Sequence, residues 1–182
     1  MPMNELNLAL FHAINLPDPA PAAALALARF ASLQLPALLV LLAMGCLWPS
    51  APRWRWLGQE LLAAMAVAWL GARALQYGWS MPRPFVLGLG HQWIEHGASP
   101  SFPSTHASVA IALGVLALWR APHPAVCWLV PMLAALVAWS RIALGVHFPV
   151  DVLAGACVGA GAAALVQWLR PRPKLAPATA TP

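Results

Sequence analysis

Residues 123–169 read HPAVCWLVPMLAALVAWSRIALGVHFPVDVLAGACVGAGAAALVQWL. This stretch contains two almost uncharged windows, 123–140 and 150–169, joined by a short polar segment. At a rise of 1.5 Å per residue, a helix of about 18 to 20 residues is nearly as long as roughly 30 Å of membrane hydrocarbon is thick. The stretch therefore predicts two membrane-crossing helices and a connection that carries titratable side chains.

Three further apolar windows continue this pattern, near residues 24–48, 56–75 and 105–119. Of the 182 residues, 61% are hydrophobic and 8% are charged, which lies outside the composition of ordinary soluble domains. We predict an all-α fold, a polytopic membrane helical bundle of about five spanning helices. As a helix, window 105–119 is only about 22 Å long, so it should begin inside protein or end near an interface. Residues 3–15 are a candidate for a further, interfacial helix.

Basic residues gather on one side of this predicted bundle. Five alternating crossings place on the same face Arg53, Arg55, Arg120, Arg170, Arg172 and Lys174. By the positive-inside rule this face is cytoplasmic, so the net charge of +5 is a matter of topology and not of nucleic-acid binding. We expect one membrane-embedded domain over residues 1–170 and a disordered cytoplasmic tail over residues 171–182.

The sequence predicts neither a metal site nor a cofactor. The cysteines lie inside apolar windows without paired spacing, at Cys46, Cys127 and Cys157. That placement argues against a disulfide framework and against a zinc site. His91, Glu95 and His96 lie near one another in the chain but lack the i, i+4 histidine pair of a helical zinc site.

Three polar clusters lie at the outward-facing ends of the windows. Ionisable groups at membrane depth are costly unless they are paired, so such clusters are candidates for function. The first is Gln76–Pro84, where Gly78 and two prolines end the second window and hold Arg83 on a stiff turn. Arginine can bind phosphate oxygens bidentately. Alternatively, Arg83 is an interfacial residue that contacts lipid headgroups.

The second cluster is SFPSTH over residues 101–106, at the start of the third window. Ser104 is the expected N-cap of a helix, and a helix N-terminus can bind phosphate through its free backbone N–H groups. His106 lies in the first turn and can donate a proton to a leaving oxygen, because its unperturbed pKa is near neutral. Taken alone, Ser104 is equally a plain cap and His106 an interfacial polar residue.

The third cluster lies in the connection that joins the fourth and fifth windows. Pro149 fits the first position of the last helix, which places Asp151 in the first turn and His147 just before it. A carboxylate bonded to one imidazole nitrogen leaves the other nitrogen as an attacking lone pair. Arg141 supplies a second phosphate-binding group. The alternative is an ion pair between Arg141 and Asp151 that ties two helices together.

In chain order these residues form three signatures. They are Arg83-Pro84, then Pro103-Ser104-Thr105-His106, then Ser140-Arg141 with five residues to His147 and three more to Asp151. Together they resemble the type 2 phosphatidic acid phosphatase superfamily over roughly residues 60–170. The segment Asn4–Asn15, with Phe102–Ser104 and Trp139–Arg141, looks like bacterial undecaprenyl-diphosphatases within that superfamily.

The resemblance implies a two-step phosphoryl transfer that needs no metal and no cofactor. If the roles known in the family apply to the matching residues, His147 attacks phosphorus and forms a phosphohistidine, Asp151 orients His147, and His106 protonates the leaving group. The implied phosphate-binding groups are Arg83, Arg141, Ser104, Thr105 and Gln76. Fixed donors around the phosphoryl oxygens are also what physical chemistry expects to matter most in such a transfer.

Two positions depart from the family pattern. The first signature usually begins with a lysine seven residues before the arginine, and here that position is Gln76, which supplies no charge. Arg73, one turn earlier, either supplies the charge or extends to lipid headgroups, and we favour the second. Thr105 stands where glycine or aspartate is common, and its methyl group should narrow the phosphate cradle.

The resemblance implies hydrolysis of undecaprenyl diphosphate to undecaprenyl phosphate, at a site on the periplasmic or outer side of a bacterial inner membrane. The polyprenyl or phospholipid chain of the substrate would stay in the bilayer. Phosphatases of phosphatidic acid or phosphatidylglycerophosphate, and a lipid A phosphotransferase, remain open. A non-enzymatic lipid-binding scaffold descended from the enzyme is the alternative from another class, and the intact His106, His147 and Asp151 argue against it. A soluble-type vanadate haloperoxidase is disfavoured by the apolar composition.

Overall fold

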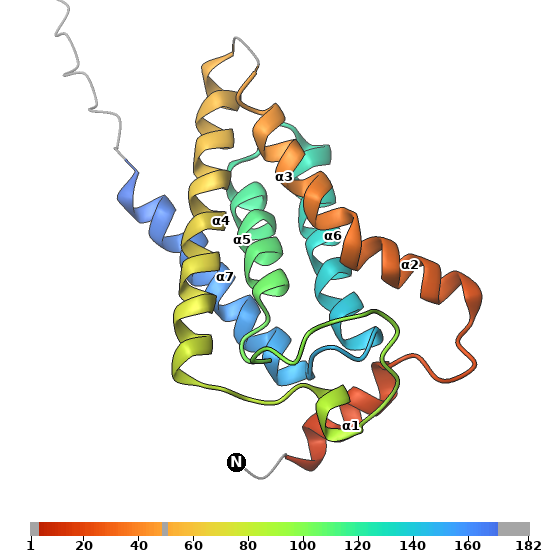
Figure 1. Ribbon diagram of the computed structural model, residues 1–182. Helices are drawn as coiled ribbons and strands as arrows, with labels where there is room; N and C mark the ends of the chain where they lie inside the picture. The colour runs from red at the N-terminus through yellow and green to blue at the C-terminus, as the bar shows by residue number, and fades with distance from the viewer. Residues whose placement is uncertain (1–3, 49–50, 171–182) are drawn as a thin grey trace, which may run out of the picture.

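A computed structural model describes residues 4–48 and 51–170 of the chain, as a bundle of helices (Figure 1). In chain order the elements are α1 (Glu5–Ile14), α2 (Ala22–Leu33), α3 (Leu35–Gly45), α4 (Pro52–Gly78), the 3₁₀ turn η1 (Pro84–Leu87), α5 (Thr105–Arg120), α6 (Pro124–Ala143) and α7 (Pro149–Leu169). Neither of the two described ranges contains a strand. The predicted all-α fold is confirmed, and a helix overlaps every predicted window. The predicted tail over residues 171–182 lies outside the described residues.

Not every helix of the bundle is long and apolar enough to be identified as a membrane-spanning helix. Within the described ranges, α6 and α7 are long and apolar enough to cross a membrane, and α2 with α3 meets the same test as one bent pair. Helix α4 is 27 residues long but carries Arg53, Arg55, Glu60 and Arg73, and α5 has only 16 residues. Two or three clear spans are therefore shown, and the predicted five are not confirmed.

The first predicted window is broken rather than continuous. Helices α2 and α3 meet at Gln34 with a bend of 45°. Pro36 lies at the start of α3. Because proline has no backbone N–H and its ring clashes with the carbonyl four residues earlier, it cannot continue α2 without a kink. The prediction of one window over residues 24–48 rested on its apolar composition and did not take Pro36 into account.

Helix α5 lies at the centre of the bundle and packs against α4, α6 and α7. Its contact with α7 depends on glycine. A Cβ at Gly155 would lie 2.6 Å from the Ser104 carbonyl oxygen, and one at Gly159 would lie 2.3 Å from that of Ser108. Small residues spaced by four along a helix allow such close approach in membrane proteins. The backbone N–H of Ser104 also donates to the carbonyl of Asp151 at 2.9 Å, so the starts of α5 and α7 are held together.

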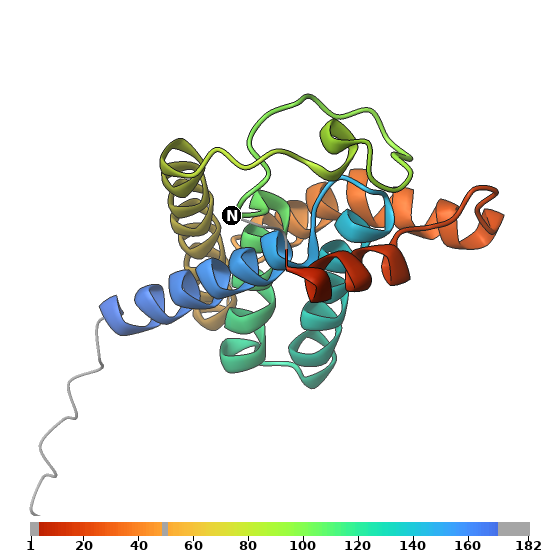
Figure 2. The ribbon, with the colours of Figure 1, turned by 90° about the horizontal axis from the view of Figure 1, so that it is seen from below.

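One end of the bundle is covered by connections. Figure 1 shows the long segment between α4 and α5 running across the lower end, beside α1 and the α6–α7 connection. Seen from below, in Figure 2, α1 lies along that same end. Asn15 fastens these parts together: its amide donates to the carbonyls of His91 and Ala143, at 3.0 and 3.1 Å, and accepts from the His91 N–H at 2.7 Å. Arg29 reaches the same segment by donating to the carbonyl of Trp93.

The other end of the bundle is held by an ion-pair cluster. Glu60 of α4 lies 3.4 Å from the Nε of Arg120 at the end of α5 and 2.7 Å from the Nε of Arg170, just after α7. Three helices thus share one carboxylate. The predicted grouping of Arg120 with Arg170 on one face is confirmed by this shared partner.

Candidate active site

The connection between α6 and α7 turns on a glycine. Gly145 has a φ of +75°, a left-handed conformation that residues with a side chain rarely adopt. A Cβ there would also lie 2.1 Å from the carbonyl oxygen of His91. The turn places His147 inward, where it is 2% exposed. As predicted, Pro149 begins α7 and Asp151 lies in its first turn, where the carboxylate also accepts from the Phe148 N–H at 2.8 Å.

The hydrogen bonds of His147 define which of its nitrogens carries a lone pair. Nη1 of Arg83 lies 3.1 Å from Nε2 of His147. Because a guanidinium only donates, Nε2 must accept, and the ring proton lies on Nδ1. On that side the Oγ of Ser101 is at 3.3 Å and Oδ2 of Asp151 at 3.5 Å. The Ser101 hydroxyl donates its proton to Oδ2 at 2.5 Å. A lone pair on the Ser101 Oγ is therefore available to accept from Nδ1–H.

Electrostatics also favour a neutral His147. Burial, and after it the positive charges of Arg141 and Arg83, hold the pKa of His147 well below its usual range. An imidazole with a lowered pKa keeps its lone pair at neutral pH. His147 therefore combines a fixed tautomer with an unprotonated Nε2, which is the state that a nucleophile requires.

Arg83 is almost completely buried, with 4% exposure. A guanidinium has five N–H groups. Here they are directed to the carbonyls of Ser99, Val146 and Pro100, to the hydroxyl of Ser99 and to His147. Burial lowers the pKa of Arg83 to about 10, so the group stays cationic at neutral pH. Its burial excludes the alternative of an interfacial arginine that contacts lipid headgroups.

The start of α5 brings the second signature to the same place. Ser104 is the N-cap, and its Oγ accepts from the Ala107 N–H at 3.4 Å, which confirms the predicted helix start. The first N–H groups of a helix have no partner within the helix and point out of its end. Thr105 and His106 occupy these first positions. Thr105 and His106 line the same cavity as His147.

Arg141 is 1% exposed and lies deeper than expected. Its Nη1 donates to the Ser32 hydroxyl, while its Nε and Nη2 have no hydrogen-bond partner in the described part of the chain. The alternative of an ion pair with Asp151 is not seen, because Asp151 instead contacts Ser101, Phe148 and His147. A buried guanidinium with two unsatisfied nitrogens raises the positive potential of the surrounding site.

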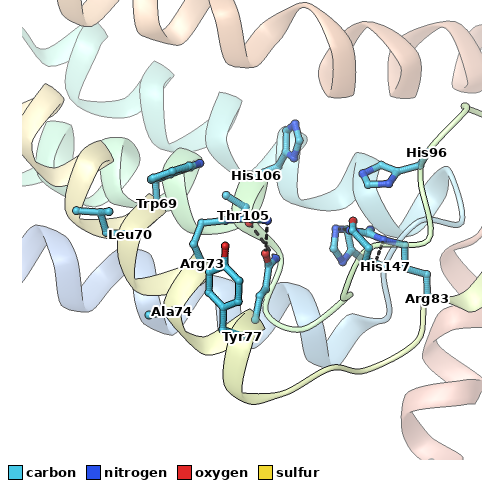
Figure 3. Close-up of a pocket in the computed structure, with 12 residues that line it drawn as sticks. Trp69, Leu70, Arg73, Ala74, Tyr77, Arg83, His96, Thr105, His106 and His147 are labelled. Atoms are coloured by element: carbon cyan, nitrogen blue, oxygen red, sulfur yellow. Dashed lines mark hydrogen bonds between the residues drawn. The ribbon is translucent and has the colours of Figure 1, made fainter.

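A cavity of about 690 Å³ lies beside His147, Arg83 and His106. Its lining consists of Trp69, Leu70, Arg73, Ala74, Gln76, Tyr77, Arg83, His96, Ser99, Thr105, His106 and His147. Figure 3 shows His147, Arg83 and His96 on one side and Arg73 with Tyr77 on the other. A neighbouring apolar cavity of about 310 Å³ shares three lining residues with the first, namely Trp69, Thr105 and His106.

The structure separates the predicted site residues into two groups. Five of them line the cavity: His147, His106, Arg83, Thr105 and Gln76. Three lie outside the lining: Asp151 behind His147, Ser104 at the cap of α5, and Arg141 in the protein interior. For all eight residues the assigned role in catalysis or phosphate binding stays a prediction.

Two residues near His147 were not singled out from the sequence. Ser101 contacts both Asp151 and His147, and thus adds a hydroxyl to the predicted contact of the carboxylate with the ring, which is present at 3.5 Å. His96 was weighed only as a metal ligand, yet its ring centroid is 6.5 Å from that of His147. Within the described ranges, no group of three or more histidine, cysteine, aspartate or glutamate side chains is arranged to hold a metal ion. The only sequence signal for Ser101 was its place two residues before Pro103.

Fold and site together define a helical membrane protein with a cavity lined by histidine and arginine. Residues 58–175 match the family described as the PAP2 superfamily. The chain belongs to this superfamily, and the resemblance drawn from its three signatures is confirmed.

Similar proteins agree with this assignment. An Escherichia coli (strain K12) protein named "Putative undecaprenyl-diphosphatase YbjG" is 34% identical over 166 residues, which are 86% of this chain and 79% of that protein. Undecaprenyl-diphosphatase BcrC of Bacillus subtilis (strain 168) is 42% identical over 72 residues, 40% of this chain and 36% of that protein. The crystal structure of Aquifex aeolicus LpxE has the same fold, with a TM-score of 0.73 at 23% identity over 91% of this chain and 97% of that one. The chain is therefore a phosphatase-family membrane protein.

Proposed function

We propose that this protein hydrolyses undecaprenyl diphosphate to undecaprenyl phosphate and inorganic phosphate. One observation carries the proposal: His147 lines a cavity, and its Nε2 lies 3.1 Å from Nη1 of the buried Arg83, which could donate to a phosphoryl oxygen instead and leave Nε2 free to attack. The substrate class follows from the names of two relatives, each of which is called an undecaprenyl-diphosphatase.

In the first step, Nε2 of His147 attacks the terminal phosphorus. A nitrogen–phosphorus bond forms, and the bond from phosphorus to the bridging oxygen breaks and leaves its electron pair on the lipid phosphate. Arg83 binds the equatorial oxygens, where negative charge is spread in the transition state. His106 protonates the leaving oxygen. The Ser101 hydroxyl accepts from Nδ1–H and donates to Asp151, and the nearby carboxylate stabilises the positive charge that develops on the imidazole.

In the second step, water attacks the phosphohistidine. His106, now without its proton, removes a proton from this water, and the nitrogen–phosphorus bond breaks to release phosphate and restore neutral His147. Neither step uses a metal ion. In this proposal the positive charge that metal ions supply in many phosphoryl-transfer enzymes comes from Arg83 and Arg141.

The apolar walls of the site support a lipid substrate. Trp69 and Leu70 line the main cavity, and Trp69 also lines the neighbouring apolar cavity between α3, α4 and α5. A third, shallower apolar hollow includes Trp69 and Leu70 as well. A polyprenyl chain that leaves the phosphate site meets these surfaces without crossing water. Burial of a chain against such surface is favourable in proportion to its apolar area.

The proposed setting is a bacterial inner membrane, with residues 1–170 as one domain of five spans. The Glu60 cluster gathers Arg120 and Arg170 at the end opposite the cavity. By the positive-inside rule that end faces the cytoplasm, and the cavity opens toward the periplasm or exterior. In this arrangement α4 and α5 cross the membrane despite the charges of α4 and the shortness of α5, because both pack against neighbouring helices.

The test is release of phosphate by purified protein in detergent, with undecaprenyl diphosphate, phosphatidic acid and phosphatidylglycerophosphate offered separately in the presence of EDTA. We expect the diphosphate to be hydrolysed fastest, and His147→Ala to abolish release. His12→Ala, an exposed histidine of α1, is the matched control that keeps activity. Unchanged release from His147→Ala contradicts the mechanism. A strict need for divalent ions contradicts its metal independence, and preference for phosphatidic acid contradicts the substrate.

A further inference from the structure

Arg73, for which the sequence favoured contact with lipid headgroups, is one of the residues that line the cavity. It lies on α4 one turn before Gln76, and its Nη1 donates to the Gln76 Oε1 at 2.9 Å. Its guanidinium carbon is also 5.7 Å from the centre of the Tyr77 ring. Figure 3 shows Arg73 directed toward Thr105. Both Arg73 and Gln76 are therefore part of the site that holds His147.

Gln76 has no N–H group left for a phosphate. It is 6% exposed. Its side-chain amide offers two N–H donors, and these donate to the carbonyl of Pro103 at 2.9 Å and to the hydroxyl of Thr105 at 3.0 Å. Its oxygen accepts from Arg73. Gln76 thus joins α4 to the start of α5 and fixes the direction of Arg73, which makes it a positioning residue rather than a direct phosphate ligand.

Arg73 and Thr105, by contrast, keep donors for a ligand. Arg73 makes one side-chain hydrogen bond in the described ranges, and the carboxylate that forms ion pairs with arginine there, Glu60, binds Arg120 and Arg170 instead. Since the Thr105 hydroxyl accepts from Gln76, its own proton is free to be donated. A guanidinium and a hydroxyl donor side by side form a binding place for an anion.

The position of this second group of donors relates it to the first. Arg83 and His147 lie on one side of the cavity and Arg73 on the other, beside the apolar Trp69 and Leu70 (Figure 3). Along the cavity, the reacting His147 is therefore followed by the second cation, Arg73, and then by the apolar wall. A diphosphate lipid has the same order: terminal phosphate, lipid-bound phosphate, hydrocarbon chain. A monophosphate lipid lacks the middle group.

We infer that Arg73 and the Thr105 hydroxyl form a second phosphate subsite, which binds the phosphate that remains on the lipid and makes the cavity selective for diphosphate over monophosphate lipids. This inference rests on the proposed function, because it takes the terminal phosphate to lie at His147. It also explains how the chain manages with a glutamine in place of the usual lysine. The glutamine positions an arginine from the preceding turn, whose longer side chain reaches further into the cavity.

The experiment measures binding rather than turnover, with two probes that differ by one phosphate: farnesyl diphosphate and farnesyl monophosphate. Full-length protein carrying His147→Ala is used so that neither probe is consumed, and dissociation constants are measured by calorimetry in detergent. Adding Arg73→Ala should weaken binding of the diphosphate about tenfold, as expected for the loss of one charge-assisted hydrogen-bonded contact, and leave binding of the monophosphate unchanged. Arg73→Lys should recover most of the loss. Arg53→Ala, on the same helix at the far end, is the matched control.

Each result decides the inference. An equal loss for both probes means that Arg73 acts on the terminal phosphate or on the site as a whole, and overturns the subsite. No loss for either probe means that Arg73 extends to headgroups, and also overturns it. Failure of the protein with intact His147 to release phosphate from undecaprenyl diphosphate would overturn the proposed function separately, because the ratio of the two binding constants does not depend on turnover.

Gln76→Ala tests the positioning role independently. Without the amide, Arg73 is no longer held toward Thr105, so the preference for the diphosphate should fall by a smaller factor than in Arg73→Ala. Combining Arg73→Ala with Gln76→Lys places a charge back on α4 near Thr105 and should restore part of the preference. Binding ratios that are the same in Gln76→Ala as in the parent protein would contradict the positioning role.

Discussion

The two ends of the bundle use arginine in opposite ways. At one end, Arg120 and Arg170 share the carboxylate of Glu60. At the other end, Arg83 donates to carbonyls, a hydroxyl and a histidine, and Arg141 keeps two nitrogens without partners among the described residues. Among the described residues no carboxylate forms an ion pair with Arg83 or Arg141, and Asp151 contacts Ser101, the peptide N–H of Phe148 and His147 instead. At the first end both arginines contact a carboxylate, whereas the two buried arginines of the second end have no such partner in the part of the chain that the structure describes, so that a bound anion can neutralise their charge.

This difference shows why the charged residues cannot be ranked by type alone. Each group consists of arginines at helix ends, and each is partly or wholly buried. What separates them is the presence or absence of a matching carboxylate. Burial of a cation without one is costly, so its persistence indicates that a ligand or a catalytic step uses it.

Exchange of Arg83 for lysine should have the largest effect. The charge stays, but one ammonium cannot replace five N–H groups directed to four protein groups and the histidine. We expect kcat/KM for undecaprenyl diphosphate to fall about 100- to 1,000-fold, the usual cost of removing a donor that stabilises transition-state charge. Arg53→Lys on the exposed start of α4 is the control. Near-normal activity of Arg83→Lys would show that Arg83 supplies only charge.

Exchange of Ser101 for alanine should have the second-largest effect on activity. The hydroxyl between Asp151 and His147 is lost, so the carboxylate no longer fixes the Nδ1–H tautomer through it. We expect kcat to fall about tenfold or more while KM changes little, because the loss concerns proton position and not substrate binding. Ser101→Thr, which keeps the hydroxyl, should recover activity. If Ser101→Thr is as impaired as Ser101→Ala, the hydroxyl is not the group that matters.

The dependence of activity on pH distinguishes a buried from an exposed nucleophile. Burial and the neighbouring arginines lower the pKa of His147, so protonation of the free enzyme requires a pH well below 6.5. The acid limb of kcat/KM should therefore lie below that value. The same shift makes the folded state less stable as pH falls below the unfolded pKa of about 6.5, because the unfolded chain binds the proton more readily. An acid limb at or above 6.5 would contradict the electrostatic account.

At the end of the bundle that contains Glu60, exchange of this residue for glutamine should leave catalysis unaffected. Arg120 and Arg170 lose their shared partner, which should lower stability by about 1–2 kcal/mol and shift the unfolding midpoint in detergent downward. The kcat of the folded variant should match that of the parent protein. A loss of kcat with unchanged stability would show that the two ends are coupled and that the comparison is too simple.

Much of this molecule followed from its sequence because the deciding patterns are local. The apolar windows gave the helices, Ser104 and Pro149 gave two helix starts, and the three signatures gave residues that do meet at one cavity. The remaining features depend on how distant segments pack. The position of Ser101 beside Asp151 is set by the path of the segment before α5, and the direction of Arg73 is set by Gln76 and by the start of α5.

Two features of the molecule were not predicted. The bend at Gln34 follows from Pro36, which the prediction of one continuous window did not take into account, and the depth of Arg141 depends on the packing of α2 against α6. The third signature identified Arg141, but not its contact with Ser32 of α2. The sequence therefore identified residues of the site, but not which of them line the cavity and which lie behind its surface.

The stereochemical course at phosphorus tests the central claim, attack by His147, most directly. The substrate is an undecaprenyl diphosphate analogue whose terminal thiophosphate is made chiral with oxygen isotopes, hydrolysed in isotopically labelled water. Two in-line displacements, first by His147 and then by water, predict retention of configuration in the released thiophosphate. This holds whether or not the phosphohistidine accumulates. Inversion would mean that water attacks directly, and would contradict the account.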